Sequence, residues 1–240
     1  MRHTVLATLA ALLVTLVAKP ARAVDVAVFD AEPIAAGWEQ VRDQDGVKVY
    51  TRKTEGTSLY ALRSDGVVDA PLDKVAQVFF DHARTPEWID RMADEHVVRF
   101  LGATEYVEYN RVNLPFPFSD RDYVTRVHVH VDTARNRLEM TSSSIDAPDL
   151  PSTCVRGSLE TAYVLSSVDG GAHTRIQVLY LMDPNGALPH WVVNIFQKSW
   201  PLATFRGIRK QLLKPDLREP PLQQLRDVVS QLRALQPTGR

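Results

Sequence analysis

The strongest constraint on the fold is a series of strand-like segments that runs from residue 96 to residue 183. Polar and apolar residues alternate along the segments, as in RDYVTRVHVHVD at 121–132, and this two-residue period is typical of a strand with one buried face. Short turn sequences separate the segments, among them Asn136 and Asp169-Gly170-Gly171. Consecutive strands joined by such short connections predict a large antiparallel sheet.

More strands and helices are predicted before this series. The segment 37–53 predicts a turn of helix, a turn at Asp45-Gly46 and then a strand, which pairs with a second strand at 59–69. The period becomes helical in DAPLDKVAQVFFD, and a short helix is expected at 85–92. The chain is therefore expected to be of the α+β class.

After the strands, PHWVVNIFQKSWPLATFRGIRKQLLKP predicts one long helix at 189–215, with a kink at Pro201. Its apolar side chains cover an arc of about 200°, wider than the roughly 100° that a helix needs to lie on a sheet. A helix this apolar, laid across a curved sheet, predicts a cavity between the two.

The last segment, 216–240, contains a shorter amphipathic pattern in PPLQQLRDVVSQLRALQ. Leu222, Leu225, Val229 and Leu232 fall on one helical face, so we expect a C-terminal helix that packs on its own domain. A dimer contact and a membrane-surface helix are the alternatives.

The first 23 residues have the pattern of a secretory signal peptide, with Ala21-Arg22-Ala23 as the cleavage site. The apolar run at 5–17 is shorter than the roughly 20 residues that span a bilayer, which disfavours the alternative of an uncleaved anchor. The protein is therefore expected to be exported to the periplasm or secreted, with a leader at 24–36 ahead of the folded domain.

Charge and cysteine content argue against a nucleic-acid-binding protein and against a disulfide-stabilised one. The whole chain has 28 basic and 29 acidic residues; cleavage removes Arg2, Lys19 and Arg22 and leaves 25 basic against 29 acidic, with no basic block. Nucleic acid is therefore not an expected partner. Cys154 stands alone, so no intramolecular disulfide is expected.

Motifs for catalysis, metals and cofactors are absent from the sequence, which contains no nucleophile elbow, phosphate loop or dinucleotide fingerprint. His128 and His130 lie two apart on a strand and could hold a metal, but without an evident third ligand an exposed face is the better interpretation. Arg121-Asp122 is interpreted as a structural ion pair, not a catalytic one. No cofactor, metal or catalytic residue is predicted.

The sequence PFPFSDRDYV at 115–124 resembles the hallmark of the START family of lipid-transfer domains, P-F-P-x-S-x-R-D-[YF]-V. Three further stretches match in the same order: DGVKVYTRK, APLDKVAQVFFD with PEWID, and DPNGALPHWVVN. The resemblance covers 37–215, nearly the whole mature chain. It implies the helix-grip fold, a curved antiparallel sheet around a long C-terminal helix that encloses a lipid cavity.

The resemblance also implies a role for the loop at 115–120. In the family this loop is a gate over the cavity, so Phe116 and Phe118 are expected to be lid residues that meet the ligand or touch a membrane transiently during exchange. The two prolines would stiffen the loop. The alternative is that both rings belong permanently to the core.

Family members also imply a ligand site. A polar cavity position of ceramide- and steroid-binding members matches Asn110, and a second one, in the ceramide-binding members, matches Ser142. The cavity arginine of the steroid-binding members is Val127 here. Side chains expected to line the cavity with them, by strand parity or from the long helix, are Tyr123, Val129, Met140, Val192, Ile195 and Phe196.

Together these residues predict a non-enzymatic carrier that binds and transfers a hydrophobic lipid. A mostly apolar cavity with neutral polar points favours a sterol-like or other neutral lipid, because a phosphate needs a cation nearby. The alternatives are a phospholipid carrier and a cyclase-like enzyme on the same fold, for which Glu108 is the only candidate acid or base. The sequence identifies no protein partner.

Overall fold

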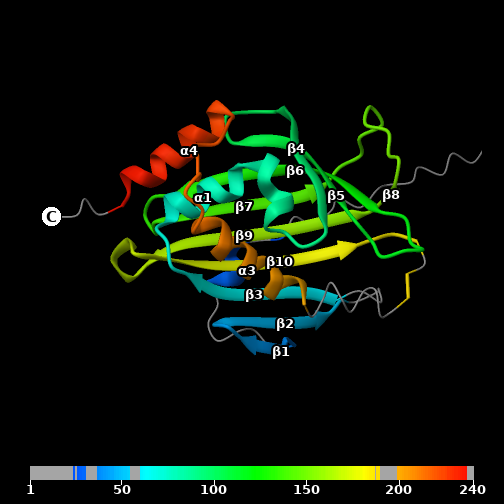
Figure 1. Cartoon of the computed structure of the whole chain (residues 1–240), viewed down its shortest axis with the longest axis horizontal. Helices are drawn as coiled ribbons and strands as arrows, with labels where there is room; N and C mark the ends of the chain where they lie inside the picture. Colours follow the sequence, from blue (N-terminus) through cyan, green and yellow to red (C-terminus); the bar gives the residue numbers. More distant parts are fainter. Residues whose placement is uncertain are drawn as a thin grey trace, which may run out of the picture.

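The computed structural model describes residues 24, 26–30, 37–54, 60–186, 188–189 and 199–236. They form a ten-stranded sheet with the order β1-β2-β3-β10-β9-β7-β6-β5-β4, and β8 pairs with β6 off this path (Figure 1). The strands are β1 Glu39–Gln44, β2 Val47–Lys53, β3 Tyr60–Val68, β4 Met92–Phe100, β5 Glu105–Val112, β6 Arg121–Asp132, β7 Arg137–Ser144, β8 Val155–Arg156, β9 Ser158–Val168 and β10 His173–Asp183. All neighbours along the main path are antiparallel, which confirms the predicted sheet.

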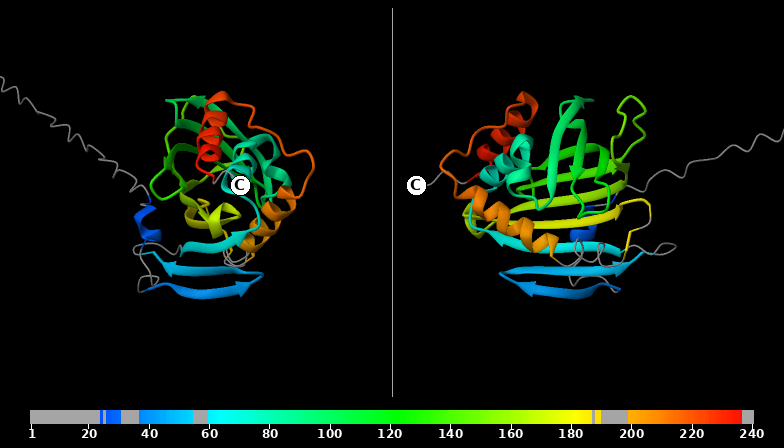
Figure 2. Two further views of the ribbon diagram at one scale, coloured as in Figure 1. Left: turned by 90° about the vertical axis from the view of Figure 1, so that its left-hand side faces the viewer. Right: turned by 45° about the vertical axis from the view of Figure 1, so that its right-hand side comes forward.

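Helices cover one face of this sheet. The α-helices are α1 Leu72–Phe80, α3 Trp200–Leu212 and α4 Gln223–Ala234, and the 3-10 helices are η1 Val26–Phe29, η2 His82–Glu87 and η3 Asp169–Gly171. The sheet curves around α1, α3 and α4, while η1 lies against its other face (Figure 2). This is the helix-grip arrangement of the α+β class.

The alternating pattern of β6 explains how the sheet separates its two faces. Val127 and Val129 are buried on the helix-covered face, whereas Arg126, His128 and His130 between and beyond them are exposed. The predicted exposed face for the two histidines is therefore confirmed. The opposite face has a smaller apolar cluster, where Phe29 of η1 packs against β3, β9 and β10.

The chain ahead of β2 differs from its prediction. Residues Glu39–Gln44 form the edge strand β1, not a turn of helix. Asp45 and Gly46 connect β1 to β2 with positive φ angles of 54° and 73°, the conformation of the tight hairpin turns that match strand twist. This turn places the preceding residues beside β2, and pairing with β2 outweighs their local preference.

The helices at the cavity also differ in extent. In place of the short helix expected at 85–92, the structure has the 3-10 helix η2, which begins at His82 and ends at Glu87. The helix α3 begins at Trp200, so Pro201 lies in its first turn, where a proline is tolerated. The kink predicted at Pro201 depends on residues before Ser199 and stays a prediction. The start of the predicted long helix, at 190–198, lies outside the described residues.

The helix α3 packs very closely on the segment after η2. A Cβ atom on Gly207 would lie 2.0 Å from the backbone oxygen of Trp88, so only glycine permits this approach. The indole Nε1 of Trp200 donates a hydrogen bond to the backbone oxygen of Asp90 at 3.2 Å. These contacts fix α3 beside the segment that borders the cavity.

The helix α4 packs back on its own domain, as expected, and contacts α1 and β6. Its buried side chains Leu225, Val228, Val229 and Leu232 belong to the same core cluster as α1 and the sheet. In the described part of the chain, no helix combines the length and the apolar character that crossing a membrane requires.

Candidate functional site

A cavity of about 110 Å³ lies between the sheet and the helices. Its wall is formed by α1, η2 and the segment after it, β4 to β7, β9, β10 and the first residue of α3. Five residues predicted for the cavity line it: Asn110, Tyr123, Val127, Met140 and Ser142. Strand parity therefore identified one wall of the cavity correctly.

Other predicted cavity residues are placed differently. Val129 faces the same side of β6 as Val127, but it is almost completely buried and does not line the cavity. Parity determines which face of a sheet a side chain occupies, and it does not determine whether a helix covers that point. Val192, Ile195 and Phe196 lie outside the described residues.

The most polar part of the wall is a group that we call the His–Glu cluster: His82 of η2, Glu95 of β4 and Glu108 of β5. The Nε2 atom of His82 lies 3.4 Å from Oε2 of Glu108. The Asn110 side chain donates to Oε1 of Glu108 at 2.7 Å, and the Thr85 hydroxyl donates to Oε1 of Glu95 at 3.0 Å. Polar groups in a cavity wall need such partners, and here η2 and β5 supply them.

Burial and mutual charge change the acidity of this cluster. Burial, with the negative charge of Glu108, raises the pKa of Glu95 to about 8. Burial alone would lower the pKa of His82, but its hydrogen bond with Glu108 and the charges of Glu95 and Glu108 outweigh burial and raise it. Burial and the same two carboxylates raise the pKa of Tyr106 well above its usual range. Glu95 therefore holds its proton at neutral pH.

Hydroxyl groups form the opposite part of the wall in two pairs. The hydroxyls of Ser142 and Thr161 lie 2.7 Å apart, on the paired strands β7 and β9. The hydroxyls of Tyr163 and Tyr180 are also hydrogen-bonded to each other, across β9 and β10. Within each pair, one hydroxyl donates a hydrogen bond to the other. Either hydroxyl can instead bond to a hydroxyl or carbonyl group of a ligand.

Aromatic rings line the apolar part of the cavity. Phe79 contacts Trp88 and Tyr163 with ring centroids 5.2 and 5.5 Å apart, and Tyr180 contacts Trp200 at 4.7 Å. Tyr163 and Tyr180 join these pairs at 5.8 Å, so the rings form one continuous wall. Rings in such tilted and edge-on contacts give a firm apolar surface for a hydrophobic molecule.

The family model of the START domain matches residues 21–214, well over half of the chain. The chain belongs to the START domain family. The phosphatidylcholine transfer protein of Bos taurus is 29% identical over 169 residues, which cover 68% of this chain and 78% of that protein. An uncharacterized protein of Pseudomonas aeruginosa is 24% identical over 180 residues, which cover 73% and 87% respectively.

Solved structures agree with this START fold. A STAR-related lipid transfer protein fragment from Xanthomonas axonopodis has a TM-score of 0.64 at 24% identity, with 74% of this chain and 99% of that one covered. Human STARD10 has a TM-score of 0.67 at 24% identity, with 75% of each chain covered. The family is thus shown by the sequence match, and the solved structures show the shared fold.

The loop at 115–120 of this START domain lies on the surface. Phe116 is 95% exposed, which excludes it from the core, and Phe118 is half-buried. Neither ring lines the cavity, but Val112 and Tyr123, which flank the loop, both do. The loop therefore stands at the edge of the cavity with at least one phenylalanine presented to the surroundings.

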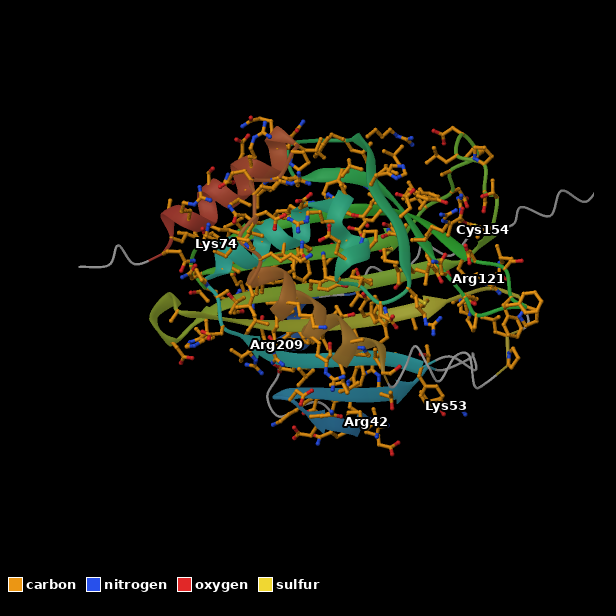
Figure 3. All side chains as sticks on the ribbon, viewed as in Figure 1. Arg42, Lys53, Lys74, Arg121, Cys154 and Arg209 are labelled. Atoms are coloured by element: carbon orange, nitrogen blue, oxygen red, sulfur yellow. The ribbon has the colours of Figure 1, made fainter. Side chains whose placement is uncertain are left out.

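The predicted ion pair between Arg121 and Asp122 is wrong. Arg121 binds backbone oxygens instead: Nε donates to Pro184 and Nη1 to Ser119, both at 2.6 Å. The Asp122 carboxylate pairs with Arg156, with Nε and Oδ1 2.7 Å apart. Adjacent strand residues point to opposite faces, so they cannot pair with each other. Figure 3 labels Arg121 at the end of the sheet where β6 begins, beside the end of β10.

Both contacts hold the base of the START hallmark loop in place. Burial alone would raise the pKa of Asp122, but hydrogen bonds from Arg156 and Ser152 outweigh it and lower the pKa. Arg121 joins the loop to the segment after β10, where its Nη2 also donates to the backbone oxygen of Asn185 at 3.2 Å. The Arg-Asp part of the motif is therefore structural, through different partners from those predicted.

Sequence analysis missed His82 and Glu95. His82 lies in a short 3-10 helix, where no periodic pattern indicates which way a side chain points. Glu95 lies on β4, whose register shifts between Met92 and Asp94 and again between Val97 and Arg99, so simple alternation fails. The only available signal was Glu108, whose shared parity with Asn110 the structure confirms.

Proposed function

We propose that this START domain is an exported, non-enzymatic carrier, which binds a hydrophobic lipid with an uncharged polar group and transfers it between membranes. One observation carries the proposal. The described residues around the cavity provide aromatic rings, hydroxyls, an amide and carboxylates, but no lysine or arginine. A buried phosphate needs a cation to offset its lost hydration, and the one basic side chain among the described residues of this wall, His82, already faces the Glu108 carboxylate at 3.4 Å.

The dimensions of the cavity support a carrier that opens. Its volume of about 110 Å³ is well below the roughly 300 to 1,000 Å³ of pockets that hold drug-sized ligands. Elements around the cavity would therefore have to separate to admit a whole lipid. The loop at 115–120 is suited to that role because it connects two strands of the cavity wall and presents Phe116 outward.

Lipid transfer between vesicles tests the proposal. Donor vesicles containing a fluorescent sterol or a fluorescent phosphatidylcholine are mixed with acceptor vesicles and the protein. We expect faster transfer of the sterol than of the phospholipid. Exclusive transfer of phosphatidylcholine would contradict the uncharged polar group, and transfer of neither lipid would contradict the carrier itself.

The gate has its own test in the Phe116→Asp, Phe118→Asp double variant. If these rings touch the membrane during exchange, transfer slows by at least about tenfold while the melting temperature changes little, since surface substitutions usually shift stability by about 0.5 kcal/mol or less. Asn113→Asp, an exposed residue on the same connection, is the matched control. A normal transfer rate in the stable double variant would remove the loop from the mechanism.

Export is proposed from the signal-peptide pattern. Cleavage after Ala23 would leave Val24 as the first residue of the mature chain. Intact mass analysis of the exported protein should show this start. A chain that retains Met1 would contradict it.

Two observations each favour an alternative function. The first is the similarity to bovine phosphatidylcholine transfer protein, whose name favours a phospholipid carrier. The His–Glu cluster favours an enzyme, because His82 and Glu108 form the convergent acid–base pair that catalysis in the cavity requires. A lipid that is chemically altered after incubation with the protein, but not after incubation with the Glu108→Gln variant, would support the enzyme.

A further inference from the structure

We propose that His82, Glu95 and Glu108 form a binding site for a divalent transition-metal ion of the Zn²⁺ type in the wall of the cavity. Their possible ligand atoms all lie within 4.8 Å of one another. Ligands of a tetrahedral zinc ion lie about 2.0 to 2.2 Å from the metal and hence roughly 3.4 Å from one another. Nε2 of His82 and Oε2 of Glu108 are already 3.4 Å apart.

The donor set selects the class of ion. One imidazole nitrogen and two carboxylate oxygens suit Zn²⁺, Mn²⁺ or Fe²⁺, whereas Ca²⁺ requires six to eight oxygen ligands. Two carboxylates also balance the charge of a divalent ion, so the filled site is neutral as a whole. This matters in a mostly apolar cavity, where an unbalanced charge is costly.

The residues around the ligands hold them in position, as a metal site requires. The Asn110 amide donates to Oε1 of Glu108 at 2.7 Å, and Oε2 faces His82. The Thr85 hydroxyl donates to Oε1 of Glu95 at 3.0 Å. Such hydrogen bonds orient the carboxylates before an ion arrives, and comparable contacts surround known metal sites.

The sheet provides a rigid frame for the two carboxylates. Glu95 pairs with Asn110 across β4 and β5, and Glu108 pairs with Val97 on the same two strands. His82 approaches from η2, directly after α1. Three ligands leave at least one coordination position, which would face the cavity because all three residues line it. An oxygen of a bound molecule, or water, could occupy that position.

Zn²⁺ titration of the chelator-treated full chain tests the site. Wild-type protein should bind one ion per chain, and Glu95→Gln and Glu108→Gln should each weaken binding by at least about 10- to 100-fold. The matched control is His128→Ala with His130→Ala, which removes an exposed histidine pair on the other face of β6. This control should bind Zn²⁺ as tightly as wild type.

Absence of Zn²⁺ binding, loss of binding in the His128/His130 control, or unchanged affinity in either glutamine variant would overturn the proposal. If a variant fails to fold, the Co²⁺-loaded wild type decides: intense visible bands of four- or five-coordinate Co²⁺ are expected, and the weak spectrum of six-coordinate Co²⁺ contradicts the site. The proposal does not depend on lipid transfer, because these titrations use metal alone and vesicle transfer can be measured on metal-free protein.

Discussion

Two neighbouring parts of the same sheet face differ in how they are covered. On β6 and β7, Val129 and Leu138 are almost completely buried and do not line the cavity, so we call this the filled part. Two residues along the same strands, Val127 and Met140 line the cavity. The residues are equally apolar, so composition alone does not distinguish the filled part from the hollow one.

The difference shows what creates the cavity. Helices α1 and α4 supply interlocking apolar side chains over the filled part. Over the hollow part, the covering elements are the end of α1, η2 with the segment after it, and the start of α3. They contribute aromatic rings and His82, while Glu95 and Glu108 come from the sheet. Close packing is the usual state of a protein interior, so a cavity retained beside such a core points to a binding role.

The largest expected effect is a difference in stability between alanine substitutions in the filled part and in the hollow part. Leu138→Ala should lower the free energy of unfolding by about 2 to 5 kcal/mol, because it opens a void in filled core. Met140→Ala, two residues away, should cost only about 1 to 2 kcal/mol, since it enlarges an existing cavity. Urea unfolding measures both. Equal losses would mean that the hollow and filled parts are packed alike.

A pH effect of intermediate size is expected from Glu95. Its folded-state pKa of about 8 lies above its ordinary value of 4.5, so the folded state holds the proton more tightly. Stability should therefore fall as pH rises from about 4.5 to 8, by at most about 1.4 kcal/mol per pH unit. The raised pKa of His82 acts in the same direction, since its contribution is lost as pH rises through the folded pKa.

Unfolding of chelator-treated protein between pH 5 and 8.5 checks this effect. Wild type should lose stability relative to Glu95→Gln across the window, because glutamine cannot ionise. Glu87→Gln is the control: hydrogen bonds from Arg84 and Lys214 lower the pKa of Glu87 to about 2, so its difference from wild type should stay constant. A constant difference for Glu95→Gln as well would mean that Glu95 is not buried as described.

The third prediction concerns ligand recognition by Asn110. Asn110→Leu keeps similar bulk and removes the amide, so affinity for a hydroxylated lipid should fall by roughly 5- to 150-fold, or about 1 to 3 kcal/mol. Affinity for a pure hydrocarbon analogue should hold or rise. Fluorescence displacement measures both ligands.

The contact between Asn110 and Glu108 sharpens this experiment. The amide already donates to Glu108, so its loss also affects the carboxylate. Repeating Asn110→Leu in a Glu108→Gln background separates direct recognition from this indirect effect. Equal losses for hydroxylated and hydrocarbon ligands would mean that Asn110 shapes the cavity without recognising the lipid.

The smallest effect is expected at Ser142. The Ser142 hydroxyl is hydrogen-bonded to that of Thr161 at 2.7 Å. A neutral hydrogen bond contributes a net free energy of about 0.5 to 1.5 kcal/mol. Ser142→Ala should therefore change lipid affinity by less than Asn110→Leu does. A larger loss would move the main recognition site from Asn110 to the hydroxyl side of the cavity.

The sequence was informative where strands are regular. Alternation along β5, β6 and β7 predicted that Asn110, Val127 and Ser142 face one cavity, because the two-residue period survives in those strands. It failed on β4, where bulges interrupt the period and conceal Glu95. It also failed for Val129, since a helix from a distant part of the chain determines what covers a sheet.

Side-chain partners were the other limit of sequence reasoning. Arg121 and Asp122 were expected to pair because they are adjacent and oppositely charged. Their partners, the backbone after β10 and Arg156, are brought close only by the folded sheet. Motif recognition thus identified the position of the hallmark loop, and three-dimensional structure was needed for its contacts.

The central claim is that the hollow part of the sheet face binds a lipid with an uncharged polar group. Native mass spectrometry tests it most directly: the chain is exposed to a total lipid extract, repurified, and its bound lipid is extracted and identified. The control is Met140→Trp, which fills the cavity and should bind none. We predict one lipid per wild-type chain, without a phosphate. A bound phospholipid, or equal lipid on wild type and Met140→Trp, would contradict the account.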